Sequence, residues 1–221
     1  MLSWKKVKKK EKQNGFKIIG GIDIKEVVIA GAVRTPIGKF SGSLKEFSAT
    51  DLGSIAIKGL LEKHGFKPYL SDKTKSYRPD RFKETEKTSV EEDYMDWSED
   101  FKDIEIDEVI MGNVLQGGQG QNPARQASIK AGIPREIPSY TVNKVCGSGM
   151  KAVTLASESI KSGESDVIIT GGMESMTNAP YILPKARWGY RMDIDTKGEL
   201  RDLMVLDGLH EIFYEIGRAH V

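Results

Sequence analysis

The chain has 221 residues, of which 38% are hydrophobic and 29% are charged, and its formal net charge is +1. This balance is typical of a globular protein without a global bias towards nucleic acid, and no apolar run approaches the roughly 18 residues of a membrane-spanning helix. The single cysteine, Cys146, excludes an internal disulfide framework and a cysteine-rich zinc site, so we expect no metal and a reducing cytoplasm.

Residues 1–24 form a basic N-terminal extension. The first 12 residues contain six lysines, and such a density of like charge opposes folding. We therefore expect a solvated tail. A transit peptide is the alternative, but those peptides favour Arg and Ser over Lys, and no apolar segment of a secretory signal follows.

The first predicted strand and helix come next in the chain. The β-branched run at residues 26–30 (EVVIA), followed by the breakers in TPIG, predicts a buried strand and then a loop. Ser48 is placed to cap the next helix, whose apolar residues recur at helical spacing until Gly65 ends it.

Residues 71–100 have a different composition. Basic residues come early and acidic residues come late, and few aliphatic side chains are present to anchor the segment. These features predict a long, charged surface insertion that is mobile, covers a partner or has no function of its own.

Strands and helices alternate after the insertion. Strands are predicted at residues 107–114, 140–145 and 166–170, one helix starts at Pro123, and another covers residues 150–161. This alternation predicts an α/β domain with a largely parallel sheet.

Cys146 lies where a predicted strand passes into a predicted helix. Small residues dominate this helix, so we expect neighbouring elements to cover it on more than one side. Unpaired N–H groups at a helix start stabilise a thiolate and can bind an oxyanion, and Gly147 and Gly149 leave room for a substrate. The pattern favours a nucleophilic cysteine for acyl transfer; a buried, inert cysteine is the alternative.

Five blocks of this sequence resemble the thiolase family, and within it the acetyl-CoA acetyltransferases. The resemblance runs from about residue 25 to residue 213, except for the insertion. The blocks occur in the family's order, which makes a chance match improbable. They are VRTPIGKF (33–40), GNVLQGGQGQNPARQ (112–126), NKVCGSGMKAV (143–153), GGMESMTNAPY (171–181) and LPKARWGYRM (183–192).

The resemblance implies a layered α/β fold of two similar halves, stacked in five layers. Residues 25–214 would be the N-terminal domain, with a mostly parallel mixed sheet and the helix after Cys146 buried at the centre. Cys146 would take an acetyl group from acetyl-CoA, and a second acetyl-CoA would condense with it to give acetoacetyl-CoA; thiolysis is the reverse. No cofactor, membrane or nucleic-acid partner is implied, and the full-length protein would be a homotetramer or homodimer.

The resemblance also places an activating histidine and a second, acid/base cysteine in the C-terminal half of the family. This sequence has only Cys146, and its histidines (His64, His210 and His220) are expected at the surface or as helix caps. We therefore expect an N-terminal part of a thiolase that shows little condensation alone. Residues 215–221 (EIGRAHV) match the translation of a common sequencing-adapter DNA, so we expect a non-native read-through tail.

Met192 is the residue that the resemblance suggests for contact with the acyl or pantetheine group. Asp193, however, stands where the family has Gly. Met173 and Met176 fit either the same pocket or the core. Three basic residues are candidates for CoA phosphates, a neighbouring subunit or simple solvation: Lys185, Arg187 and Arg191.

Two other classes of protein stay open. A ketoacyl synthase, or another condensing enzyme of the superfamily, shares the fold and a cysteine at a helix start, but QNPARQ and GGMESM favour a thiolase. A non-catalytic truncated fragment is the second alternative. Transfer of label from acetyl-CoA to Cys146 separates these alternatives.

Overall fold

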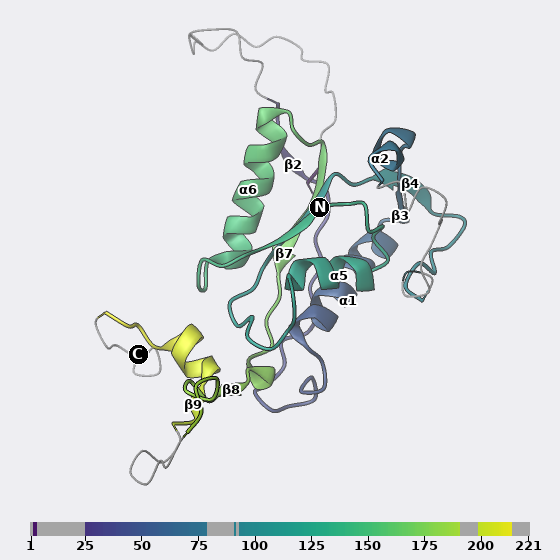
Figure 1. Ribbon diagram of the computed structural model, residues 1–221. Coiled ribbons are helices and arrows are strands. Elements are labelled where there is room, and N and C mark those ends of the chain that lie inside the picture. Colours follow the sequence, from purple (N-terminus) through teal and green to yellow (C-terminus); the bar gives the residue numbers. More distant parts are fainter. Residues whose placement is uncertain (1, 4–24, 79–90, 92, 191–198, 214–221) are drawn as a thin grey trace, which may run out of the picture.

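The computed structural model describes residues 2–3, 25–78, 91, 93–190 and 199–213. Its centre is a five-stranded sheet in the order β2-β1-β7-β5-β6 (Figure 1). Strand β5 (Glu108–Gly112) runs parallel to both β6 (Ser139–Val142) and β7 (Val167–Gly172). The short strands β1 (Leu2–Ser3) and β2 (Val28–Ile29) continue beyond β7 with antiparallel pairing. The sheet is thus mixed and mostly parallel, as predicted.

Helices cover both faces of the parallel strands (Figure 1). Helices α1 (Ala49–Lys63) and α5 (Pro123–Lys130) pack on the face that presents Val109 and Met111. Helix α6 (Ser148–Ser162) packs on the opposite face, against Ile110. Successive side chains of a strand point to opposite faces, so β5 is buried on both sides and reads as a continuous apolar run. The predicted α/β class is confirmed.

The start of α1 is fixed by its cap. Ser48 and Asp51 form a capping box, in which the Ser48 side chain accepts from Asp51 N and the Asp51 carboxylate accepts from Ser48 N. The helix ends at His64, and Gly65 follows with a φ of +66° that favours glycine. The predicted capping role of Ser48 is confirmed.

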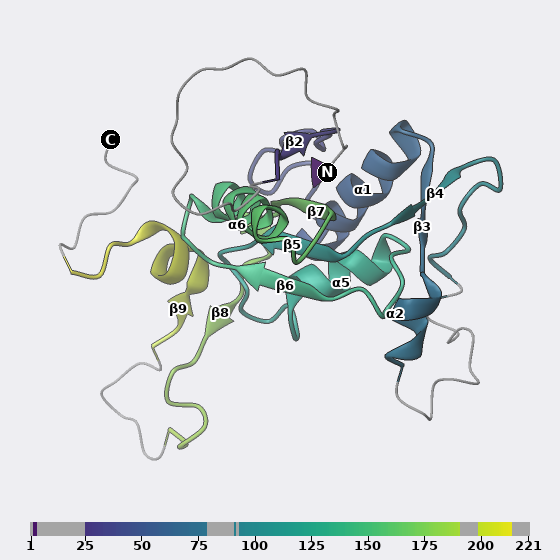
Figure 2. The ribbon, with the colours of Figure 1, turned by 90° about the horizontal axis from the view of Figure 1, so that it is seen from above.

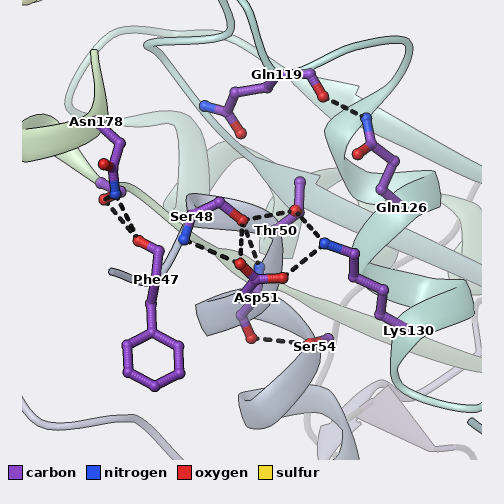
Figure 3. A network of polar contacts seen from close by, with 10 residues as sticks. Phe47, Ser48, Thr50, Asp51, Ser54, Gln119, Gln126, Lys130 and Asn178 are labelled. Atoms are coloured by element: carbon purple, nitrogen blue, oxygen red, sulfur yellow. Dashed lines mark hydrogen bonds and ion pairs between the residues drawn. The ribbon is translucent and has the colours of Figure 1, made fainter. Parts of the chain in front are cut away.

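Polar contacts join α1 to α5 on one face of the sheet (Figure 3). The Lys130 ammonium lies 2.6 Å from the Asp51 carboxylate and 3.2 Å from Thr50 Oγ1. The two helices also approach closely, since a Cβ on Gly53 would lie 3.2 Å from Ala127 Cβ. Lys130 and the small residues thus fix α5 on α1.

Helix α6 buries a single row of side chains. Ser148, Ala152, Ala156 and Ile160, spaced four apart, face the sheet and are all at most 4% exposed. Met150, on the other side, is 71% exposed. Within the described residues the sheet covers one side of α6, and cover on a second side stays a prediction.

A second, two-stranded sheet flanks the insertion (Figure 2). Strands β3 (Phe66–Tyr69) and β4 (Lys102–Glu105) pair in parallel, and the short helix α2 (Asp72–Ser76) follows β3. The sequence did not predict these strands, because Pro68 interrupts the first and the second is mostly charged.

The insertion is not simply a solvated surface loop. Trp97 donates a hydrogen bond from Nε1 to Gly132 O at 3.0 Å, and the Lys58 ammonium lies 5.5 Å from the centre of its ring. Arg78 binds Glu136 at 2.6 Å with both side chains mostly buried. One aromatic side chain and ion pairs therefore anchor the described ends of the insertion, which has few aliphatic residues.

The segment after β7 first packs on residues 45–47 through Ser175 and Asn178, and from β8 onwards it extends away from the main body (Figure 1). It contains the short helix η1 (Met176–Asn178), the antiparallel pair β8 (Tyr181–Ile182) and β9 (Arg201–Asp202), and a π-helical turn, η2 (Met204–Leu209). Within the described ranges, no helix is long and apolar enough to cross a membrane.

Candidate functional site

The loops after β5, β6 and β7 meet at the carboxyl ends of these parallel strands, where α/β sheets commonly bind ligands. The loop after β6 passes through Cys146 and enters α6, whose N-cap is Gly147. Cys146 is exposed and lies just before the helix rather than within it. The prediction that it lies at a strand-to-helix junction is confirmed, and its catalytic role stays a prediction.

The residue before the cysteine has an unusual backbone. Val145 has a φ of +49°, a left-handed conformation that is rare for a β-branched residue. Asn143 supports it, because its Oδ1 accepts a hydrogen bond from Val145 N at 3.0 Å. Such a conformation costs on the order of 1–3 kcal/mol and is found most often where function requires it.

Three glycines bring the start of α6 onto the ends of two strands. A Cβ on Gly112, at the end of β5, would lie 2.4 Å from Gly149 N. A Cβ on Gly172, at the end of β7, would lie 3.2 Å from Gly149 Cα. Gly149 was expected to leave room for a substrate, but it instead permits this backbone contact. The turn that carries Cys146 is thereby set against β5 and β7.

Glu174 joins the loop after β7 to the loop after β5. Its carboxylate accepts hydrogen bonds from Val114 N at 2.9 Å, Leu115 N at 3.2 Å and Asn113 Nδ2 at 2.8 Å. Burial raises the pKa of Glu174 and outweighs these three donors, which act to lower it. Glu174 was not among the residues predicted for the site. The pattern that points to it is an acidic residue shortly after a buried strand that ends in two glycines.

A hollow of about 680 Å³ lies beside the sheet, between residues 29–40, α1 and the end of β7. Its lining includes Met173 and Met176, but not Cys146. Met173 also belongs to the core cluster with α1 and α5, whereas Met176 is 39% exposed. Since Cys146 does not line this hollow, its position does not support the prediction that Met173 and Met176 contact an acyl group.

The other predicted residues are exposed, cap a helix or lie outside the described residues. Met192, Arg191, His220 and residues 215–221 belong to the part that is not described. Lys185 and Arg187 are exposed, and His64 is the C-cap of α1, as predicted. Among the described residues, no three acidic, His or Cys side chains gather as a metal site would require.

One family model matches most of the sequence. The family model described as "Thiolase, N-terminal domain" matches residues 27–74 and 95–220, so the unmatched stretch falls within the insertion. An acetyl-CoA acetyltransferase of Syntrophomonas wolfei is 43% identical over 195 residues, which is 87% of this chain and 40% of that protein. An acetyl-CoA acetyltransferase of Cupriavidus necator is 42% identical, with 87% and 40% covered.

A probable acetyl-CoA acyltransferase of Staphylococcus aureus is 40% identical over 193 residues, with 86% of this chain and 39% of that protein covered. The chain therefore spans about 40% of the length of these curated relatives. The match to the N-terminal domain extends over most of the sequence, on both sides of the insertion. The chain belongs to the thiolase family and contains its N-terminal domain.

Proposed function

We propose that the protein to which this chain belongs is an acetyl-CoA C-acetyltransferase. Cys146 attacks the thioester carbonyl of acetyl-CoA, CoA leaves as its thiol, and the acetyl group stays on the sulfur. The enolate of a second acetyl-CoA then attacks the acetyl carbon, which gives acetoacetyl-CoA and returns the thiol; the reverse sequence is thiolysis. The observation that supports this most is the exposed Cys146 directly before α6.

The geometry at Cys146 suits the first of these steps. The positive end of the α6 dipole lies at this turn and favours a negative charge that develops beside Cys146. The names of the Syntrophomonas wolfei and Cupriavidus necator relatives support acetyl-CoA as the acyl donor. We extend the proposal to a cytoplasmic homo-oligomer that needs no bound cofactor.

Condensation requires more than the nucleophile. A base must remove a weakly acidic α-proton from the second acetyl-CoA, while donors hold the enolate oxygen. Cys146 is the only cysteine of the sequence and cannot be nucleophile and acid/base thiol at once. We therefore expect this chain to accept an acetyl group without sustained synthesis of acetoacetyl-CoA.

Radiolabelled acetyl-CoA tests the proposal. The folded chain should gain label on Cys146, and Cys146→Ser should gain none, with Met150→Ala as an exposed control on the same helix. Absence of label from the folded chain would favour the non-catalytic alternative. Sustained acetoacetyl-CoA synthesis by the chain alone would show that it carries the whole catalytic apparatus.

A further inference from the structure

Ser148 is the first residue of α6, and its side chain is fully engaged. The residue is 4% exposed. Its hydroxyl donates a hydrogen bond to Val145 O at 2.5 Å and accepts one from Lys144 N at 2.8 Å. Both partners are main-chain groups of the residues that directly precede Cys146, so one hydroxyl contacts the turn at two points.

The same turn has two main-chain hydrogen bonds. Gly147 N donates to Lys144 O, and Ser148 N donates to Val145 O, each at 3.0 Å. The main chain on both sides of Cys146 is thus tied together while the cysteine itself stays exposed. An unfavourable φ, such as that of Val145, persists only where the surroundings over-determine it, and Ser148 contributes to this.

The position also restricts what the residue can be. The main-chain carbon of Ser148 would lie 2.4 Å from a Cβ on Gly112, so the helix start lies directly on the strand. An alanine there would leave Lys144 N without its side-chain acceptor and Val145 O without its hydroxyl donor. A small side chain that both donates and accepts meets both demands.

We propose that Ser148 is a positioning residue for the nucleophile, and this inference rests on the proposed function of Cys146. Its hydroxyl holds the turn of residues 144–148, so that Cys146 stays at the N-terminal end of α6. Without the hydroxyl the turn loosens, and a thiolate at Cys146 loses the stabilisation that the helix start provides.

Alkylation of Cys146 by iodoacetamide tests this directly, because the probe needs neither acetyl-CoA nor turnover. We expect Ser148→Ala to lower the rate constant about three- to tenfold at about pH 7, as the net loss of an ordinary hydrogen bond implies. At about pH 10, where a cysteine is largely ionised in any surroundings, the two rate constants should converge. The difference between these two pH values separates positioning of the thiolate from a general loss of structure.

Ser54→Ala is the matched control. Ser54 is also a nearly buried helical serine, at 8% exposed, and its hydroxyl donates to the carbonyl of Asp51 three residues earlier at 2.8 Å. Its removal should leave alkylation within about twofold at both pH values. Ser148→Thr and Ser148→Val form a second pair of equal shape, in which only Thr should retain the faster reaction at about pH 7.

Equal rate constants for the parent chain and Ser148→Ala at about pH 7 would overturn the proposal. An equal loss at both pH values, or a similar loss in Ser54→Ala, would overturn it as well. The failure of the proposed function is distinguishable: normal alkylation with no acetyl label on Cys146 would reject the acetyltransferase proposal and leave the role of Ser148 in place.

Discussion

Lys130 and Asp51 form an ion pair of 2.6 Å between α5 and α1 (Figure 3). Burial acts to raise the pKa of Asp51, but the hydrogen bonds from Lys130 and Ser48 together hold it below its usual value. A lowered carboxyl pKa contributes stability that is present above the unfolded value of about 3.9 and is lost as pH falls through the folded value.

The variant Asp51→Asn should therefore lower the free energy of unfolding by about 1 kcal/mol near neutral pH, because the cap and a partly exposed ion pair are both weakened. The difference from the parent chain should shrink as the pH falls below about 4. Urea denaturation at a series of pH values measures it. Asp72→Asn, whose side chain is 96% exposed, is the control and should change stability by at most about 0.5 kcal/mol.

A side chain at Gly112 should disrupt the contact between the end of β5 and the start of α6. Gly112→Ala places a methyl group 2.4 Å from main-chain atoms of Ser148 and Gly149, neither of which can rotate away. We expect a loss of about 2–3 kcal/mol in the free energy of unfolding. Gly59→Ala is the matched change in α1, where nothing lies within 4 Å, and it should be neutral or stabilising by up to about 1 kcal/mol. Similar losses in both variants would contradict the backbone contact.

Trp97 should contribute far more to stability than another tryptophan of the chain. Trp97→Ala removes packing and the hydrogen bond to Gly132, and should cost about 3 kcal/mol. Trp97→Phe keeps most of the packing and should cost about 1 kcal/mol. Trp188 is 80% exposed, so Trp188→Ala should change thermal stability little. Equal losses of stability in the two alanine variants would mean that Trp97 does not anchor the insertion.

Removal of the Glu174 carboxylate should destabilise the fold. In Glu174→Ala, the N–H groups of Val114 and Leu115 lose their acceptor, which should lower the free energy of unfolding by about 2–3 kcal/mol. Glu158→Ala is the control, since that side chain on α6 is 65% exposed. Chemical denaturation of both variants gives the comparison, and a neutral Glu174→Ala would mean that other groups or water replace the carboxylate.

The sequence predicted those elements whose pattern is local. Helix α1 has a cap at Ser48 and a stop at Gly65, and α5 begins at Pro123, so each carries its own signals. Strands β5 and β7 are short β-branched runs. The position of Cys146 before α6 followed from the same local pattern.

Features that depend on distant partners were not predictable from the sequence alone. The main-chain groups that bind Glu174 lie about 60 residues earlier, and Trp97 meets Gly132, 35 residues later. The surroundings of α6 are a similar case, since small side chains show that close packing is possible but not what packs there.

The contact among Gly112, Gly149 and Gly172 is made by main chain against main chain. The seating of the α6 start on β5 and β7 consequently does not depend on the rotamer of any side chain at this contact. A change in the size of core residues can therefore alter the surroundings of the thiol without moving the backbone contact that holds its turn.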